Sequence, residues 1–189
     1  KTSVAAHFVQ AACQRKERCS FFCFEESRGQ IIRNMRSIGM DLEPHVQSGL
    51  LRFITARPTL HGLETHLTLM LRATGEFKPS IVVMDPITNF LAVGTSSESK
   101  SMLMRLVDFL KSDGITALFT SLTEAGPGYN QEQGEVGLSS MIDTWLLLRD
   151  LEINGERNRG LYIIKARGLA HSSQIREFLL TDHGAELVD

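Results

Sequence analysis

The sequence predicts an α/β fold, with a mostly parallel sheet followed by an antiparallel extension. In the first two thirds, short apolar runs of strand length alternate with stretches of helical periodicity. In the last third, strand-like runs follow one another with only turns between them, and Asn154-Gly155 is a strong hairpin signal. Alternating strands and helices indicate parallel strands covered on both faces, whereas consecutive strands indicate antiparallel pairing. We expect residues 1–189 to form one domain.

The expected elements follow in order along the chain. An amphipathic stretch at the amino terminus precedes a strand from Cys19 to Phe24, and Ser27-Arg28-Gly29-Gln30 has the form of a capping box that starts a helix. Further strands are expected at 50–55, 80–84 and 115–120, and helices at 63–71 and 100–110. The antiparallel strands are expected at 144–148, 160–165 and 175–180.

Composition narrows the class of protein. The chain has 189 residues, 42% hydrophobic and 22% charged, with a net charge of -2, so nothing favours nucleic acid or an anionic membrane as the main partner. Cys13, Cys19 and Cys23 fit no zinc pattern and are expected to be reduced core thiols. No apolar run is long enough to span a membrane and no signal peptide is recognisable, so we expect a soluble, cytoplasmic protein.

Polar residues follow several predicted strands. Glu25 and Glu26 come after Phe24, Asp85 after Met84, and Thr120 after Phe119. Ligands bind outside the carboxyl ends of strands in such sheets, so converging carboxylates are candidates for a metal or general-base site. The alternative for Glu25 and Glu26 is that they only favour a helix amino terminus.

The residues Lys1-Thr2 match the last two positions of a phosphate-binding glycine loop, G-x-x-x-x-G-K-[ST]. In that motif Lys1 would reach the outer phosphates of a nucleotide and Thr2 would bind magnesium. An apolar helix follows, and residues 81–85, Ile-Val-Val-Met-Asp, have the form of an apolar strand ending in a magnesium-binding Asp85. The sequence therefore predicts an ATP and Mg²⁺ site, in a P-loop NTPase core whose first strand and glycine loop are missing from the chain.

Ordered matches along the whole chain resemble the KaiC family, whose domains are RecA-like ATPases of the cyanobacterial circadian clock and their relatives. They include Phe24-Glu25-Glu26-Ser27, Asp143-Thr144, Lys165-Ala166-Arg167-Gly168 and Thr181-Asp182-His183-Gly184. The resemblance implies a homo-hexameric ring with ATP at each subunit boundary, and Kai-type partner proteins. It also implies that Glu25 and Glu26 are catalytic carboxylates, and that a neighbour supplies Arg159, Lys165, Arg167 and His171 to the phosphates.

The resemblance further implies a pair of phosphorylation sites. Ser139 and Ser140 fall where the family's C-terminal domain carries adjacent hydroxyl residues that it phosphorylates itself, so the chain resembles that copy more than the N-terminal one. Paired serines in a loop are otherwise ordinary solvated residues.

Three hypotheses for function remain open. The first is an ATPase and serine autokinase, and the second is a nucleotide-gated assembly module with little catalysis. The third is a RecA-like or RadA-like DNA-dependent ATPase. Residues 121–137 contain Glu124, Glu132 and Glu135 but no Lys or Arg, which makes a poor surface for a phosphate backbone.

Overall fold

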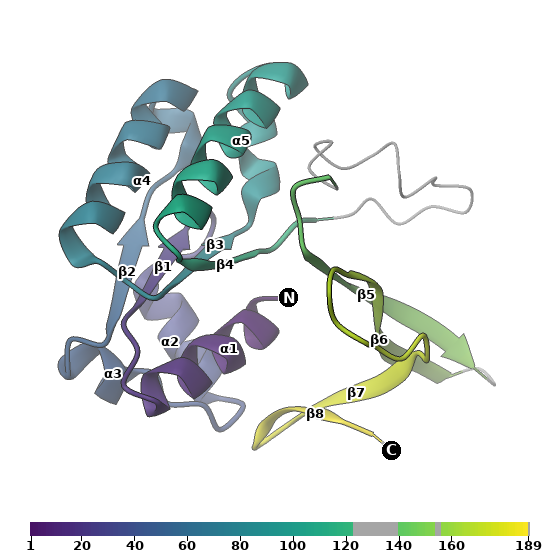
Figure 1. Cartoon of the computed structure of the whole chain (residues 1–189). Helices are drawn as coiled ribbons and strands as arrows, with labels where there is room; N and C mark the ends of the chain where they lie inside the picture. Colours follow the sequence, from purple (N-terminus) through teal and green to yellow (C-terminus); the bar gives the residue numbers. More distant parts are fainter. Residues whose placement is uncertain (123–139, 154–155, 189) are drawn as a thin grey trace.

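The computed structural model describes residues 1–122, 140–153 and 156–188. Its helices and strands are, in order, α1 (Thr2–Gln14), β1 (Cys19–Cys23), α2 (Arg28–Arg36), α3 (Glu43–Gln47), β2 (Leu51–Thr55), η1 (Pro58–Leu60), α4 (Leu63–Phe77), β3 (Ile81–Asp85), η2 (Ile87–Ala92), α5 (Ser96–Ser112), β4 (Thr116–Phe119), β5 (Thr144–Ile153), β6 (Glu156–Ala166), β7 (Arg176–Thr181) and β8 (Gly184–Leu187). The α/β prediction is confirmed (Figure 1).

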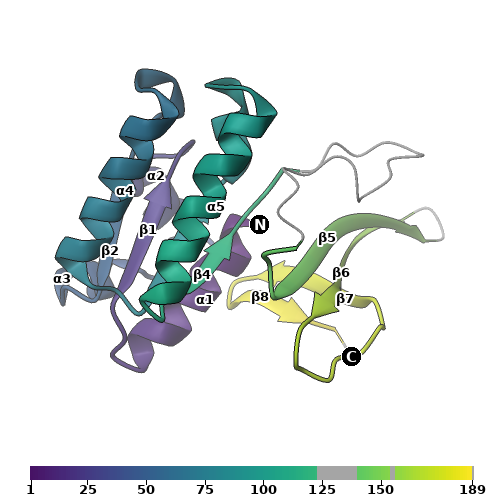
Figure 2. The ribbon, with the colours of Figure 1, turned by 45° about the horizontal axis from the view of Figure 1, so that its top comes forward.

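Four strands form a parallel sheet in the order β2-β1-β3-β4, and four more form an antiparallel arrangement in the order β5-β6-β7-β8. The predicted switch from parallel to antiparallel pairing is therefore correct. Asn154-Gly155 lies outside the described residues, but the backbone pairing of β5 with β6 extends to Ile153 and Glu156 on either side. The antiparallel strands lie beside the parallel sheet, next to the end of β4 (Figures 1 and 2).

Two hydrophobic clusters sandwich the parallel sheet because alternate strand residues point to opposite faces. Phe21 and Val83 pack with α1 and α2 on one face. Phe22 and Val82 pack with α4 and α5 on the other face, and Figure 2 shows these two helices side by side. Every residue of β1 and β3 is buried, as expected for central parallel strands. Among the described residues, no helix is long and apolar enough to cross a membrane.

Helix boundaries differ from the sequence-based ones for an identifiable reason. The predicted helix at 100–110 begins earlier, at Ser96, because the Thr95 hydroxyl accepts a hydrogen bond from the Glu98 N–H and the Glu98 carboxylate accepts one from the Thr95 N–H. The capping box at Ser27 and Gln30 starts α2 as predicted. The helix α3 and the strand β8 were not predicted, since both are short.

The β7–β8 hairpin packs against α1. The Ala185 N–H donates to His7 Nε2 at 2.6 Å, which joins residues at opposite ends of the chain. Gly184 has a φ of +100°, and a Cβ atom at this position would lie 2.1 Å from the His7 ring. The turn therefore requires glycine both for its backbone conformation and for space. This contact fixes the β7–β8 hairpin relative to α1, the helix that begins at Thr2.

Candidate active site

Backbone hydrogen bonds hold three strands together at the carboxyl edge of the parallel sheet. The Phe24 N–H donates to the Asp85 carbonyl at 2.9 Å, just after β1, and the Thr120 N–H donates to the Met84 carbonyl at 3.0 Å. The Ile87 N–H donates in turn to the Thr120 carbonyl at 2.9 Å. The positions of the residues at this edge are thus set by the sheet itself and do not depend on exposed side chains.

Asp85 lies at the centre of this edge. It is the last residue of β3, is only 8% exposed, and accepts a hydrogen bond from the Thr120 hydroxyl. A buried carboxylate needs such a partner, because desolvation without one is costly. Its oxygen atoms, together with threonine hydroxyls, are the hard ligands that Mg²⁺ prefers. The chemistry of the residues therefore fits a magnesium-bound phosphate ligand.

Lys1 and Thr2 lie at the same edge. The Lys1 Nζ donates to the Ser121 carbonyl. Ser121 directly follows Thr120, whose hydroxyl donates to Asp85. The Asp85 carboxylate is near enough for its charge to act on the backbone nitrogen of Lys1. Thr2, the first residue of α1, is half-buried. The fold thus brings together Lys1, Thr2 and Asp85, which the sequence placed in one site.

Glu25 and Glu26 follow β1 but have different surroundings. Glu25 is exposed, whereas Glu26 is half-buried and accepts a hydrogen bond from Asn34 Nδ2 at 3.1 Å. Burial raises the pKa of the Cys23 thiol to about 12, and the charges of Asp85 and Glu26 both add to this increase. Glu26 and Asp85 are therefore near the same thiol, and Glu26 is the better placed member of the pair.

The expected convergence of three carboxylates on a metal ion is not found. In the part of the chain that the structure describes, no three His, Cys, Asp or Glu side chains are close enough to hold a metal ion. Glu26 is half-buried and near the Cys23 thiol, as Asp85 is, whereas Glu25 is exposed. A magnesium site at this edge would therefore need phosphate oxygens to complete its ligands, as the Thr2 and Asp85 assignment implies.

Lys165 and Arg167 lie in another cluster, around Asp143. Arg167 Nη2 donates to the Ser140 carbonyl at 2.7 Å, and Lys111 Nζ is 2.9 Å from the Asp143 carboxylate. The hydrogen bond from Lys111 holds the pKa of Asp143 below its usual value, with further contributions from the Arg167 and Lys165 charges. These cations are therefore gathered around Asp143.

The other two residues that the resemblance implied are exposed. Arg159 pairs in register with Asp150 across β5 and β6. A ring nitrogen of His171 is 3.4 Å from the Leu169 carbonyl. Ser139 lies outside the described residues, whereas Ser140 is exposed. Glu124, Glu132 and Glu135 also lie outside them.

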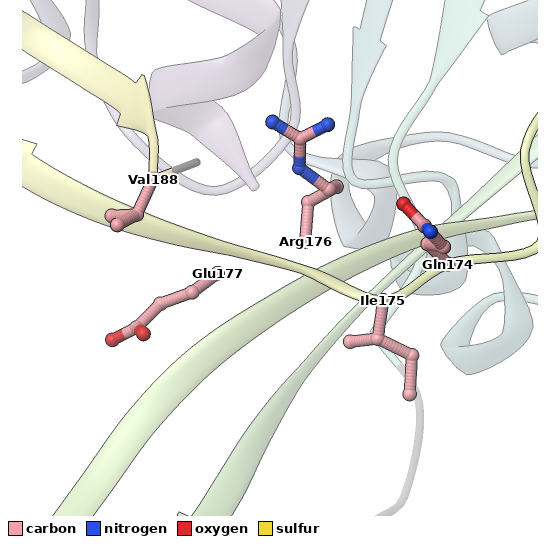
Figure 3. A pocket seen from close by; sticks show the side chains of 5 residues that line it. All are labelled: Gln174, Ile175, Arg176, Glu177 and Val188. Carbon is pink, nitrogen blue, oxygen red and sulfur yellow. The ribbon is translucent and has the colours of Figure 1, made fainter.

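A cleft of about 680 Å³ runs along β4, between that strand and the start of β5. Lys1 and Ser121 line this cleft at the carboxyl end of β4. Lys111, near the end of α5, and Asp143, just before β5, line the same cleft. A smaller pocket of about 440 Å³ lies on the antiparallel strands, lined by Gln174 to Glu177 and Val188 (Figure 3). In Figure 3 the Ile175 and Arg176 side chains leave the strand on opposite sides. None of the predicted site residues lines this second pocket.

Sequence reasoning missed Lys111, Asn34 and the role of Asp143. Asn34 lies in the last turn of α2 and donates to Glu26, eight residues before it, a separation that no local motif covers. Lys111 and Asp143 are far apart in the sequence, so no local pattern could pair them.

The architecture and this edge define a RecA-like α/β domain, in which an apolar strand ends in a buried aspartate next to a Lys-Thr pair. Comparison with known proteins agrees with that class. Residues 1–189 match the family model described as the KaiC ATPase. The chain therefore belongs to the KaiC family.

Several curated relatives are similar over the whole chain. "Circadian clock protein KaiC2" of Synechocystis sp. is 51% identical over 189 residues, which is 100% of this chain and 33% of the relative. "Circadian clock oscillator protein KaiC" is 39% identical in Thermostichus vulcanus and 35% identical in Synechococcus elongatus, each over 100% of this chain and 36% of the relative. The chain thus spans about a third of the length of the relatives it matches.

Proposed function

We propose that this chain binds ATP with Mg²⁺ at the carboxyl edge of the parallel sheet and hydrolyses it. The observation that supports this most is Asp85, buried at the end of β3, bonded to Thr120 and close to Lys1. Lys1 and Thr2 would hold the phosphates, and Thr2 and Asp85 would hold Mg²⁺. The metal ion would supply positive charge to neutralise the phosphate oxygens.

Glu26 is the proposed general base, with Glu25 as its less buried neighbour. The oxygen of a water molecule bonds to the γ-phosphorus, the bond from that phosphorus to the bridging oxygen breaks, and ADP leaves with that oxygen. Glu26 takes the water proton. Its hydrogen bond to Asn34 at 3.1 Å would orient the carboxylate for this step.

A neighbouring subunit would supply Lys165 and Arg167, together with Arg159 and His171, in a homo-hexamer. This part of the proposal is supported by the contacts of these cations within their own chain, since Arg167 is 3.8 Å from Asp143 and the Lys165 charge acts on the same carboxylate. Cations from a neighbour stabilise charge on the transferring phosphoryl group and make turnover depend on assembly.

Autophosphorylation of Ser139 and Ser140 is the second activity that we propose. The serine hydroxyl oxygen would take the place of the attacking water, with its proton passing to a glutamate base. The exposure of Ser140 supports it as an acceptor. Kai-type partner proteins and a cytoplasmic location belong to the same proposal, by analogy with the clock relatives.

The alternative with the most support is a nucleotide-gated assembly module, because Glu25 is exposed and the cations of this chain contact Asp143. A RecA-like or RadA-like DNA-dependent ATPase has no observation in its favour among the described residues.

The test is ATP turnover by the protein with a complete glycine loop before Lys1. Glu26→Gln removes the base and keeps the size, so turnover should fall by about 10²- to 10⁴-fold with nucleotide affinity nearly unchanged. Glu25→Gln is the matched control and should cost much less. Unchanged turnover in the double variant would refute the catalytic assignment.

Phosphorylation is tested separately with labelled ATP. Label should appear on one or both of Ser139 and Ser140, and replacing both with alanine should remove it while hydrolysis continues. The absence of label in a protein that hydrolyses ATP would favour the pure ATPase.

A further inference from the structure

The Ser121 hydroxyl group, two residues after the end of β4, is a buried polar group. Its Oγ atom is shielded from solvent, and among the described residues no donor or acceptor lies within hydrogen-bonding distance of it. Buried hydroxyl groups in proteins nearly always form hydrogen bonds, because burial removes the bonds that water would make. A hydroxyl group of this kind at the edge of a cleft is therefore a candidate contact for a ligand.

Two other hydroxyl groups of the described residues share this property but not this position. Ser20 is 0% exposed in β1, and Thr74 is 1% exposed on α4. Neither residue lines either of the two cavities described above. Ser121, in contrast, lines the cleft of about 680 Å³ along β4. Of these three residues, Ser121 is thus the one that a molecule bound in the cleft can contact.

Hydrogen bonds on both sides fix the position of Ser121. The Thr120 N–H donates to the Met84 carbonyl at 3.0 Å, within the pairing of β3 with β4. The Leu122 N–H donates to Thr88 Oγ1 at 3.4 Å. The backbone that carries the Ser121 hydroxyl is therefore held in place before a ligand arrives, which lowers the entropic cost of binding.

The neighbours of Ser121 indicate which part of a nucleotide would reach it. The Lys1 Nζ donates to the Ser121 carbonyl, and the hydroxyl of the preceding Thr120 donates to Asp85. In the glycine-loop motif this lysine reaches the outer phosphates, and the aspartate at the strand end acts on Mg²⁺. Ser121 is therefore at the tip of the lysine side chain, on the side of the terminal phosphate.

We propose that the Ser121 hydroxyl donates a hydrogen bond to an oxygen atom of the γ-phosphate, and that this contact makes the site bind ATP more tightly than ADP. A serine O–H is a suitable donor for an anionic oxygen, and the bond would satisfy the buried hydroxyl group. The proposal rests on the proposed ATP site for the position of the nucleotide.

The test compares two nucleotides by isothermal titration calorimetry with Mg²⁺, using the protein with a complete glycine loop before Lys1. The first is the β,γ-imido analogue of ATP, which keeps the γ-phosphate and is not hydrolysed, and the second is ADP. Ser121→Ala should weaken binding of the analogue by about 10- to 100-fold, the usual loss for one hydrogen bond to a charged group. Its affinity for ADP should stay the same, because ADP has no γ-phosphate.

Two further variants separate this contact from a structural role. Ser121→Thr keeps the hydroxyl and should retain most of the affinity for the analogue. Ser20→Ala is the matched control, since it also removes a buried hydroxyl without a partner among the described residues, and it should leave both affinities unchanged. Thermal unfolding of Ser121→Ala without nucleotide should match that of the unchanged protein, because no hydrogen bond among the described residues is lost.

The outcomes distinguish this proposal from the proposed function. Equal losses of affinity for the analogue and for ADP in Ser121→Ala, or no loss for either, would overturn the γ-phosphate contact and leave the ATP site standing. A lower unfolding temperature of Ser121→Ala together with equal losses would assign the hydroxyl a structural role instead. If the unchanged protein bound neither nucleotide, the ATP site and the Ser121 contact would both be refuted.

Discussion

Asp85 and Arg167 represent two regions that hold charged residues in different ways. Asp85 is 8% exposed, ends a fully buried strand, and is fixed by a hydroxyl and by backbone hydrogen bonds between β1, β3 and β4. The Arg167 side chain is 51% exposed and contacts a carbonyl and a carboxylate on the approach to β5. Backbone pairing fixes the first region, whereas solvated ion pairs of low net strength hold the second. The second region is thus the one that can change partners at little cost.

The largest expected effect is a difference between two leucine-to-alanine variants in the free energy of unfolding that they lose. Leu103 is 0% exposed in the cluster between α5 and the parallel sheet, whereas Leu179 on β7 is 47% exposed. Leu103→Ala should lower the free energy of unfolding by about 2–5 kcal/mol because it leaves a cavity. Leu179→Ala should change it by less than about 0.5 kcal/mol. Denaturant unfolding of both variants checks this, and equal losses would mean that the antiparallel strands are as tightly packed as the core.

The junction between the regions should be the next most sensitive feature. Gly184→Ala places a Cβ atom 2.1 Å from the His7 ring, at a φ of +100°. The hairpin must then move away from α1, at a cost of about 1–3 kcal/mol. Gly168→Ala is the control, since its φ is +68° but nothing lies near the added atom. Hydrogen exchange at the Ala185 N–H should speed up in Gly184→Ala alone; the same rate in both variants would rule out the His7 contact.

The smallest effect is expected at the exposed ion pair of Lys111 and Asp143. The hydrogen bond from Lys111 lowers the pKa of Asp143 in the folded state, so this contribution is present above the unfolded pKa and is lost as the pH falls through the folded value. Asp143→Asn should therefore cost about 0.2–1 kcal/mol at neutral pH and almost nothing in strong acid. Thermal unfolding at both pH values measures this. A cost that grows on acidification would contradict the assigned sign.

The parts of the fold predicted correctly from sequence are those set by local patterns. Ser27-x-x-Gln30 started a helix where expected, and the apolar run before Asp85 became a buried strand. The capping box at Thr95 and Glu98 begins α5 four residues before the predicted start, although its residues have the same spacing as Ser27 and Gln30. The pairs Lys111–Asp143 and His7–Ala185 could not be predicted, because they depend on how distant segments pack. The placement of Lys1 and Asp85 at one edge of the sheet could be predicted, because parallel strands bring their carboxyl ends together.

The difference between the regions leads to one central claim, that a buried strand end and an exposed cation from a neighbouring subunit together form one ATP site. The direct test mixes Glu26→Gln and Arg167→Gln variants of a protein with a complete glycine loop. Each variant alone should lose most of its turnover, by about 10²-fold or more. In mixed rings formed at random from equal amounts, about a quarter of the boundaries combine an intact Glu26 with an intact Arg167, so turnover should recover to about a quarter of the unchanged protein. Mixed rings, verified by native mass spectrometry, with no more turnover than the separate variants would contradict the claim.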